Sequence, residues 1–171
     1  TFKLLRNYPE AERYFDRAIS LSPDWPAVYT GKAKLYLRWE GSTEKARAVL
    51  DEGLQNIKSA KNPFIDTLVT LDVYDRNYQE ALDQLSLKSE DIDSQFRFIP
   101  KALRCAQISG YINKNELAKK YYDEARTILE AKIAEQPQDD RFHSSLGIAY
   151  AGLGRKEDAI REGKLAVELL P

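Results

Sequence analysis

The sequence contains few of the side chains that most often carry catalysis or bind metals. Its 171 residues include one cysteine, one histidine and no methionine. A single cysteine excludes an internal disulfide, and one cysteine with one histidine cannot complete a four-ligand structural zinc site. The 26 basic and 27 acidic residues give a formal charge of −1, so no bulk attraction draws the chain to nucleic acid or anionic lipid. We therefore expect no cofactor, no metal and no nucleic-acid partner.

Long hydrophobic runs are also missing. No segment approaches the roughly 20 apolar residues of a membrane span, and residues 1–6 have no apolar core of signal-peptide length. The composition, 43% hydrophobic and 31% charged, is typical of folded, soluble proteins. We expect no insertion into membranes and a cytoplasmic location.

What the sequence does contain is a repeated pattern of small residues. Alanines recur with spacings of 35, 35, 37 and 41 at Ala11, Ala46, Ala81, Ala118 and Ala159. In four segments a second small residue follows seven positions later, at Ala18, Gly53, Ala125 and Ala166. Small residues at this spacing lie on one stripe of a helix and let a neighbouring helix approach closely. Asn7, Asn77 and Asn113 each precede a Glu by three residues, a pattern that predicts helix caps.

The prolines and the apolar periodicity predict helices throughout the chain. All seven prolines lie at the expected ends or first turns of helices, where a missing N–H is tolerated. No stretch shows the alternation of a strand, and residues 86–97 are expected to form a polar loop. The expected helices span residues 8–22, 25–40, 43–57, 63–75, 78–87, 98–111, 114–135, 139–152 and 156–169.

Two helices per unit, a period near 34 residues and a closing proline resemble the tetratricopeptide repeat. The last unit matches the family's offsets best, through Leu146, Gly147, Tyr150, Leu153, Gly154, Ala159, Ala166 and Pro171. Asp72 and Ser109 depart from the family pattern, which favours an aromatic residue there. The resemblance implies an all-α, right-handed superhelical solenoid of antiparallel helix pairs with about 4.5 repeats. It would be a single domain over 1–171, with units at 1–23 (partial), 24–60, 61–97, 98–137 and 138–171.

This resemblance also implies a non-catalytic scaffold that binds a protein, as a peptide or partner helix, in a concave groove. The first helix of each pair lines that groove in the family. Four-residue steps along these helices predict the groove residues Lys34, Arg38, Asp66, Thr70, Tyr74, Leu103, Gln107, Tyr111, Ser144 and Ile148. For Tyr74 and Tyr111 the alternative is packing against the next helix. The predicted core on the same helices is Leu35, Tyr36, Leu68, Leu71, Ala102, Cys105, Ala106, Leu146 and Tyr150.

Three other functions remain open from the sequence. Residues 149–171 resemble repeat arrays of bacterial multidomain signalling proteins, so the chain could be a regulatory or sensor domain of a longer enzyme or transcription regulator. An RNA-binding helical repeat would need a basic stripe, which the charge of −1 disfavours. A clamp for the C-terminal carboxylates of chaperones could use Lys34 and Arg38, but Asp66 would repel such a ligand.

The few reactive side chains favour structural roles. His143 falls where the family places a bulky packing residue, and Cys105 falls on the buried stripe, so a thiol–imidazole dyad is disfavoured. Asp91 and Asp93 lack the glycine and closing glutamate of a calcium loop and are expected in a solvated loop. The segment 152–154 fits an inter-helix turn rather than a dinucleotide loop.

Both ends of the chain are expected to expose apolar stacking surface. Leu165, Val167, Leu169 and Leu170 lie in the last expected helix, where a solenoid normally has a polar cap. Such ends would continue into further repeats or associate with a second copy. The missing Met at position 1 and the partial first unit lead us to expect that the chain is part of a longer protein.

Overall fold

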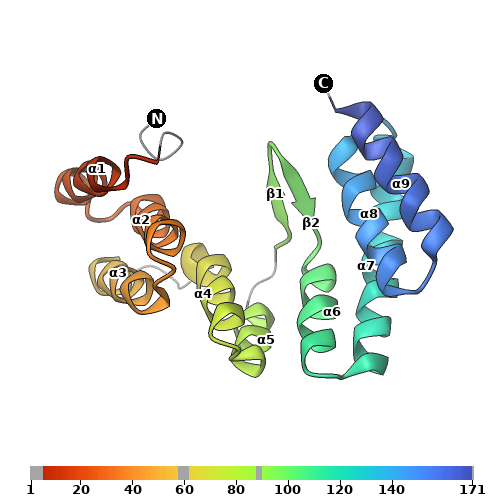
Figure 1. The fold of residues 1–171 in the computed structure, drawn as a ribbon, viewed down its shortest axis with the longest axis horizontal. Helices are drawn as coiled ribbons and strands as arrows, with labels where there is room; N and C mark the ends of the chain where they lie inside the picture. Colours follow the sequence, from red (N-terminus) through yellow and green to blue (C-terminus); the bar gives the residue numbers. More distant parts are fainter. Residues whose placement is uncertain (1–5, 58–61, 88–89, 171) are drawn as a thin grey trace. The chain divides into compact units, whose positions relative to one another are not determined.

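The computed structural model describes residues 6–57, 62–87 and 90–170. Within these ranges the chain forms nine α-helices and one two-stranded hairpin (Figure 1). The elements are α1 (Tyr8–Leu21), α2 (Pro26–Trp39), α3 (Thr43–Asn56), α4 (Asn62–Tyr74), α5 (Tyr78–Ser86), β1 (Ile92–Ser94), β2 (Arg97–Ile99), α6 (Lys101–Tyr111), α7 (Asn115–Glu135), α8 (Asp140–Gly152) and α9 (Lys156–Leu169). All nine expected helices are confirmed, with ends within three residues of the prediction. Among them, none has the length and apolar character that a membrane span requires.

One backbone feature recurs in step with the repeated alanines. All five residues with positive φ in the described ranges lie directly before the N-cap of the second helix of a pair: Arg6, Gly41, Arg76, Asn113 and Gly154. Each lies five residues before its alanine, so the spacings are again 35, 35, 37 and 41. A left-handed residue reverses the chain between the paired helices, and this confirms the register of the repeat.

The expected asparagine caps are wrong in detail. Asn7 and Asn77 occupy N-cap positions, but neither side chain makes a capping hydrogen bond. Asn113 lies one residue before the N-cap, with φ of 57°, a conformation that asparagine tolerates better than most residues. The asparagines therefore occupy the inter-helix turns without closing them through their side chains.

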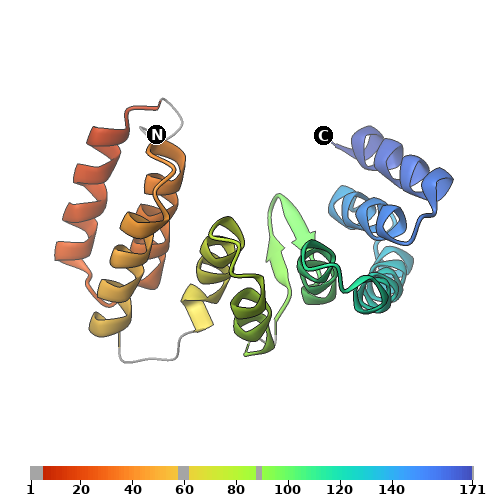
Figure 2. The same ribbon diagram turned by 60° about the horizontal axis from the view of Figure 1, so that its bottom comes forward.

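The contacts divide the chain into two compact units, Thr1–Lys88 and Ser89–Pro171. The grouping of all residues into one array stays a prediction. In the first unit α2 packs against α1, α3 and α4, and α4 packs against α5 (Figure 2). The core of this unit consists of Val28, Tyr29, Ala33, Tyr36, Ala46, Val49, Leu50, Ile57, Phe64 and Leu71.

A buried ion pair in the first unit accounts for one departure from the family pattern. The carboxylate of Asp72 lies 2.7 Å from Nη2 of Arg47 on α3, and the same guanidinium reaches Asp75 at 2.8 Å. Burial nevertheless raises the pKa of Asp72 above its ordinary value, against the hydrogen bond from Arg47. An aspartate is accommodated at this buried position because α3 supplies its partner.

In the second unit α6, α7, α8 and α9 pack successively against one another, and β2 packs against α8 (Figure 1). Phe98 and Phe142 meet edge to face with ring centroids 5.0 Å apart. The core consists of Phe98, Ala102, Leu103, Ala125, Leu129, Phe142, Leu146, Ala149 and Tyr150. Of the core predicted on the first helix of each pair, every member is buried except Leu68, which is partly buried.

The expected loop at 86–97 is wrong over its second half, where the chain forms the hairpin. Ile92 pairs with Ile99 and Ser94 with Arg97 in an antiparallel register. Phe98 turns its ring into the core while its neighbours in the strand stay more exposed. Because residues 98 and 99 belong to β2, α6 begins at Lys101, three residues later than expected.

Candidate functional site

The structure places the predicted groove residues of the first unit on two helices that pack together. Lys34 and Arg38 lie on α2, half-buried and exposed respectively. Asp66, Thr70 and Tyr74 lie on α4; the Thr70 hydroxyl donates to the Asp66 carbonyl at 2.8 Å, and Tyr74 is 64% exposed. These residues remain candidates for the predicted groove.

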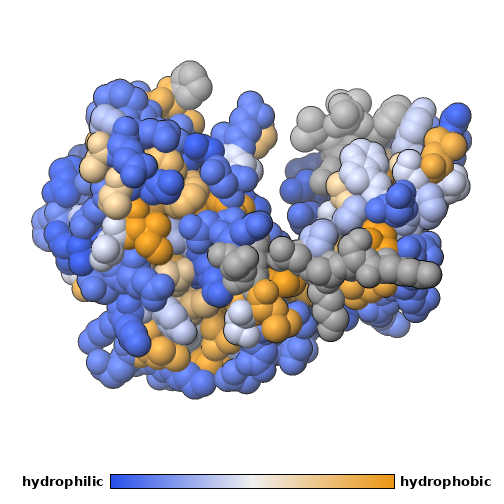
Figure 3. Space-filling model, turned by 180° about the vertical axis from the view of Figure 1, so that it is seen from behind, coloured by the Kyte–Doolittle hydropathy of each residue, from blue (hydrophilic) through white to orange (hydrophobic). Residues whose placement is uncertain are grey.

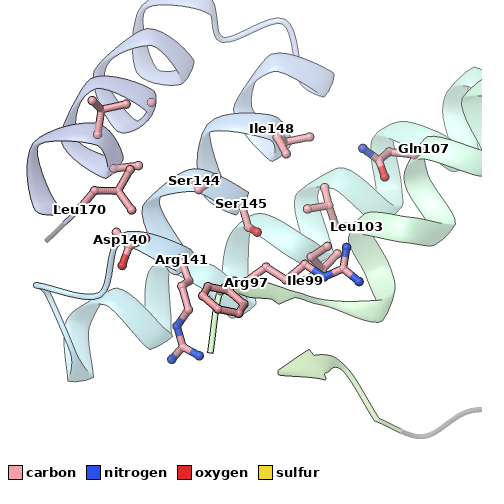
Figure 4. A pocket seen from close by; sticks show the side chains of 14 residues that line it. Arg97, Ile99, Leu103, Gln107, Asp140, Arg141, Ser144, Ser145, Ile148 and Leu170 are labelled. Atoms are coloured by element: carbon pink, nitrogen blue, oxygen red, sulfur yellow. The ribbon is translucent and has the colours of Figure 1, made fainter. Parts of the chain in front are cut away.

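In the second unit four of the five predicted groove residues line one pocket of about 390 Å³. Leu103 and Gln107 come from α6, and Ser144 and Ile148 come from α8 (Figure 4). Leu103 belongs to the buried core and forms part of the floor. The fifth, Tyr111, is 57% exposed at the end of α6 and lies outside the lining. The remaining lining residues are Phe96, Arg97, Ile99, Asp140, Arg141, Ser145, Gly163, Ala166, Val167 and Leu170.

The α9 wall of this pocket follows a helical stripe. Gly163, Ala166, Val167 and Leu170 recur at the i, i+3, i+4, i+7 positions of one face. A Cβ added at Gly163 would meet no atom within 4 Å, so the pocket is open at this point. On this face the small residues Gly163 and Ala166 lie beside the larger, exposed Val167 and Leu170. This arrangement lets another helix approach α9 closely.

Arg141 holds the hairpin wall against α8. Its Nη1 donates to the Ser94 carbonyl at 2.6 Å and to Asp93 at 3.0 Å. Its Nε and Nη2 bind the carboxylate of Asp139, whose pKa these hydrogen bonds hold below its ordinary value. The Ser145 hydroxyl also donates to the Phe98 carbonyl. The pocket wall is therefore fixed by polar contacts from α8 to both strands.

The acidic residues expected in a solvated loop have structural partners instead. Asp91 accepts a hydrogen bond from the backbone N–H of Lys101 at 2.8 Å, and Asp93 binds Arg141. Across the described ranges, no three or more His, Cys, Asp or Glu side chains gather in a way that could hold a metal ion. The expectation of a loop is corrected for Asp93, which lies in β1, although its side chain is 65% exposed as expected.

Large apolar side chains surround the pocket and face solvent. Phe96 is 84% exposed, and Val167, Leu170 and Ile148 are 68%, 58% and 43% exposed. Figure 3, seen from the opposite side to Figure 1, shows the hairpin tip projecting from the surface. In the same view, hydrophobic residues are exposed in several places among hydrophilic ones. Exposed apolar residues gathered at one cavity are typical of interaction sites.

Two charged side chains of the lining have no ion-pair partner in the described part of the chain. They are Arg97 on β2 and Asp140 at the start of α8. Figure 4 places Asp140 and Leu170 toward one end of the pocket, and Arg97 and Gln107 toward the other. By contrast, Arg141 is neutralised by Asp139 and Asp93. Within the described residues, the pocket thus has an apolar middle between one unpaired cation and one unpaired anion.

The lone histidine has the structural role that the sequence predicts. His143 is buried, with Nδ1 2.7 Å from Glu162 Oε2 and Nε2 3.0 Å from the Pro137 carbonyl oxygen. Both ring nitrogens are therefore occupied by contacts that join α8 to α9 and to the preceding turn. Burial raises the pKa of the Cys105 thiol, which makes this cysteine a poor nucleophile.

Sequence reasoning missed the residues that the hairpin and α9 contribute to the pocket. Phe96, Arg97 and Arg141 lie outside the four-residue steps along the first helices. The exposed apolar residues of α9 were predicted as a stacking surface, and Val167 and Leu170 do line the pocket. No sequence signal marked Phe96 as a hairpin tip, because the strands on either side have three residues each and are too short to show alternation.

Comparisons with known proteins agree with this repeat architecture. Residues 116–171 match the family model described as tetratricopeptide repeat. A crystal structure of MamA is similar over 98% of this chain and 91% of its own, with 16% identity and a TM-score of 0.51. A MamA structure labelled AMB-1 is similar over 98% of this chain and 92% of its own, with 15% identity and a TM-score of 0.53. No curated protein matches the sequence. Residues 116–171 therefore carry the sequence pattern of the tetratricopeptide repeat, and the chain has an all-α, solenoid-type repeat fold.

Proposed function

We propose that the chain is a non-catalytic protein-interaction scaffold whose second unit binds an amphipathic helix in the pocket. The observation that carries this proposal is the convergence of Leu103, Gln107, Ser144 and Ile148 on one cavity with exposed apolar side chains around it. Helical-repeat folds commonly use such surfaces to bind protein segments. Apolar anchors in a pocket with a polar rim are the usual energetic centre of such interfaces.

The shape of the lining favours a helix over an extended peptide. The α9 wall presents an unbroken helical stripe, and the α8 wall presents Ser144 and Ile148 four residues apart. Helices pack most closely where small residues such as Gly163 and Ala166 form a groove between larger neighbours. A partner with apolar residues at i, i+3, i+4 and i+7 would place its stripe along this groove.

Selection from a displayed library of amphipathic helical peptides, with the full chain as target, tests this proposal. Val167→Asp should weaken binding of the selected peptides by at least about tenfold, because it puts a charge in the apolar wall. Ile160→Asp is the matched control, since Ile160 is an exposed apolar residue of the same helix, 49% exposed, outside the lining. Equal binding by both variants, or selection of no helical peptide, would contradict the proposal.

A further inference from the structure

We propose that the partner in this pocket is a second copy of the same chain, docked around a two-fold axis. This inference rests on the proposed function, because it uses the same pocket. A two-fold interface is isologous, so one surface must carry both members of every contact that it makes. Three properties of the second unit meet that requirement.

The first property is a projecting side chain beside a cavity. Phe96 occupies the turn between β1 and β2, where glycine, asparagine and aspartate are the common residues. Its ring is 84% exposed although it lines the pocket, so its own fold buries little of it. Arg141 and Ser145 hold the strands that carry it. One copy therefore offers a fixed apolar projection and a cavity of about 390 Å³ on the same face.

The second property is the pair of unpartnered charges. Arg97 and Asp140 lie toward opposite ends of the pocket (Figure 4), and neither has an ion-pair partner among the described residues. A two-fold axis through the middle of this face brings Arg97 of each copy toward Asp140 of the other. The dimer then contains two such ion pairs, which a partner with a single charge would not supply.

The third property is the apolar surface between these charges. Ile148, Val167 and Leu170 are each more than two-fifths exposed, and they lie around the small residues of α9. Such side chains remain costly to leave in water, and covering them with the same residues of a second copy removes that cost on both sides. The charges orient the copies, while the apolar residues supply the affinity.

Charge reversal tests this inference with the full chain alone. Sedimentation velocity over a concentration series should show a monomer–dimer equilibrium for the wild-type chain. Arg97→Glu and Asp140→Lys, each alone, should raise the dimer Kd by about tenfold, because each creates two like-charge contacts. An equimolar mixture of the two variants should return to the wild-type Kd, because Glu at 97 then meets Lys at 140 of the other copy, and the two unmodified residues meet across the axis.

A control and a second readout keep the outcomes separate. Lys120→Glu makes the same change of charge at an exposed position of α7 outside the pocket and should leave the Kd unchanged. A monomeric wild-type chain at all concentrations, or a mixture that associates no better than each variant alone, would overturn the inference. If the helical peptides above still bind and Val167→Asp still weakens them, the proposed function stands and only the identity of the partner is wrong.

Discussion

Replacing Gly53 with alanine should destabilise the first unit, although the same exchange stabilises most helices. Gly53 lies within α3, and a Cβ at this position would lie 2.8 Å from Cγ of Tyr29 and 3.0 Å from Cε1 of Phe64. Both rings are fully buried. The Tyr29 hydroxyl donates to the Pro23 carbonyl at 2.8 Å and accepts from Asn56 at 2.9 Å, so two hydrogen bonds hold the ring at its hydroxyl end.

The size of the effect follows from two opposing contributions. Overpacking of a rigid core costs about 1–3 kcal/mol, and the higher helix propensity of alanine offsets about 1 kcal/mol of that cost. Because a Cβ 2.8 Å from a buried ring forces a shift, we place the cost in the upper part of that range, about 2–3 kcal/mol. We expect a net loss of about 1–2 kcal/mol and a fall in Tm of about 5–10 °C, measured by circular dichroism during thermal unfolding.

Gly110→Ala is the matched control for this substitution. A Cβ at Gly110 would meet no atom within 4 Å, so the exchange in α6 should be neutral or stabilising by up to about 1 kcal/mol. Gly53→Ala at or above the wild-type Tm would refute the argument that this small residue exists to admit the neighbouring rings.

Other substitutions test the turns, the contact between α8 and α9, and acid sensitivity. Arg76→Gly should stabilise the fold by about 0.5–1 kcal/mol and Gly154→Ala should destabilise it by about 1–2 kcal/mol, because both positions have left-handed φ, 61° and 76°. Urea unfolding measures both changes, and effects of the same sign would contradict the strain argument. Glu162→Ala removes the 2.7 Å partner of buried His143 and should lower the free energy of unfolding, measured in urea, by about 1–3 kcal/mol. The control Glu168→Ala, at an exposed position, should lower it by less than about 0.5 kcal/mol. Equal losses in the two variants would count against the buried contact. Hydrogen bonds from Arg141 lower the folded-state pKa of Asp139, so this carboxylate stabilises above its unfolded pKa of about 4 and the contribution is lost as pH falls. Asp139→Asn should therefore be less stable near neutrality and lose less stability on acidification, and an unchanged pH profile of unfolding would contradict this.

The helical architecture could be predicted because its determinants are local and repeat along the chain. Ala46 and Gly53 lie seven residues apart and mark one packing stripe, and Pro26 marks a first helical turn. The turn residues were harder, because Arg6 and Arg76 adopt a left-handed φ that their side chains do not favour. The position in the repeat, rather than the residue type, decides that conformation.

The hairpin and its share of the pocket could not be predicted from local pattern. Strands of three residues are too short to show alternation in the sequence. The feature that distinguishes β2, the burial of Phe98 between more exposed neighbours, is visible only in the structure. The contact between Arg141 and Asp93 joins residues 48 positions apart, a separation that no periodicity encodes. Four-residue steps found Gln107 and Ile148 because both lie on helices whose faces the repeat had already assigned.

Hydrogen–deuterium exchange of the full chain, with and without a saturating concentration of a selected helical peptide, tests the central claim most directly. The claim is that the pocket of the second unit is where protein segments bind. It predicts slower exchange on binding in residues 92–99 of the hairpin and residues 163–170 of α9, the segments that form two of its walls. Slower exchange confined to α1–α5, with both walls unchanged, would contradict it.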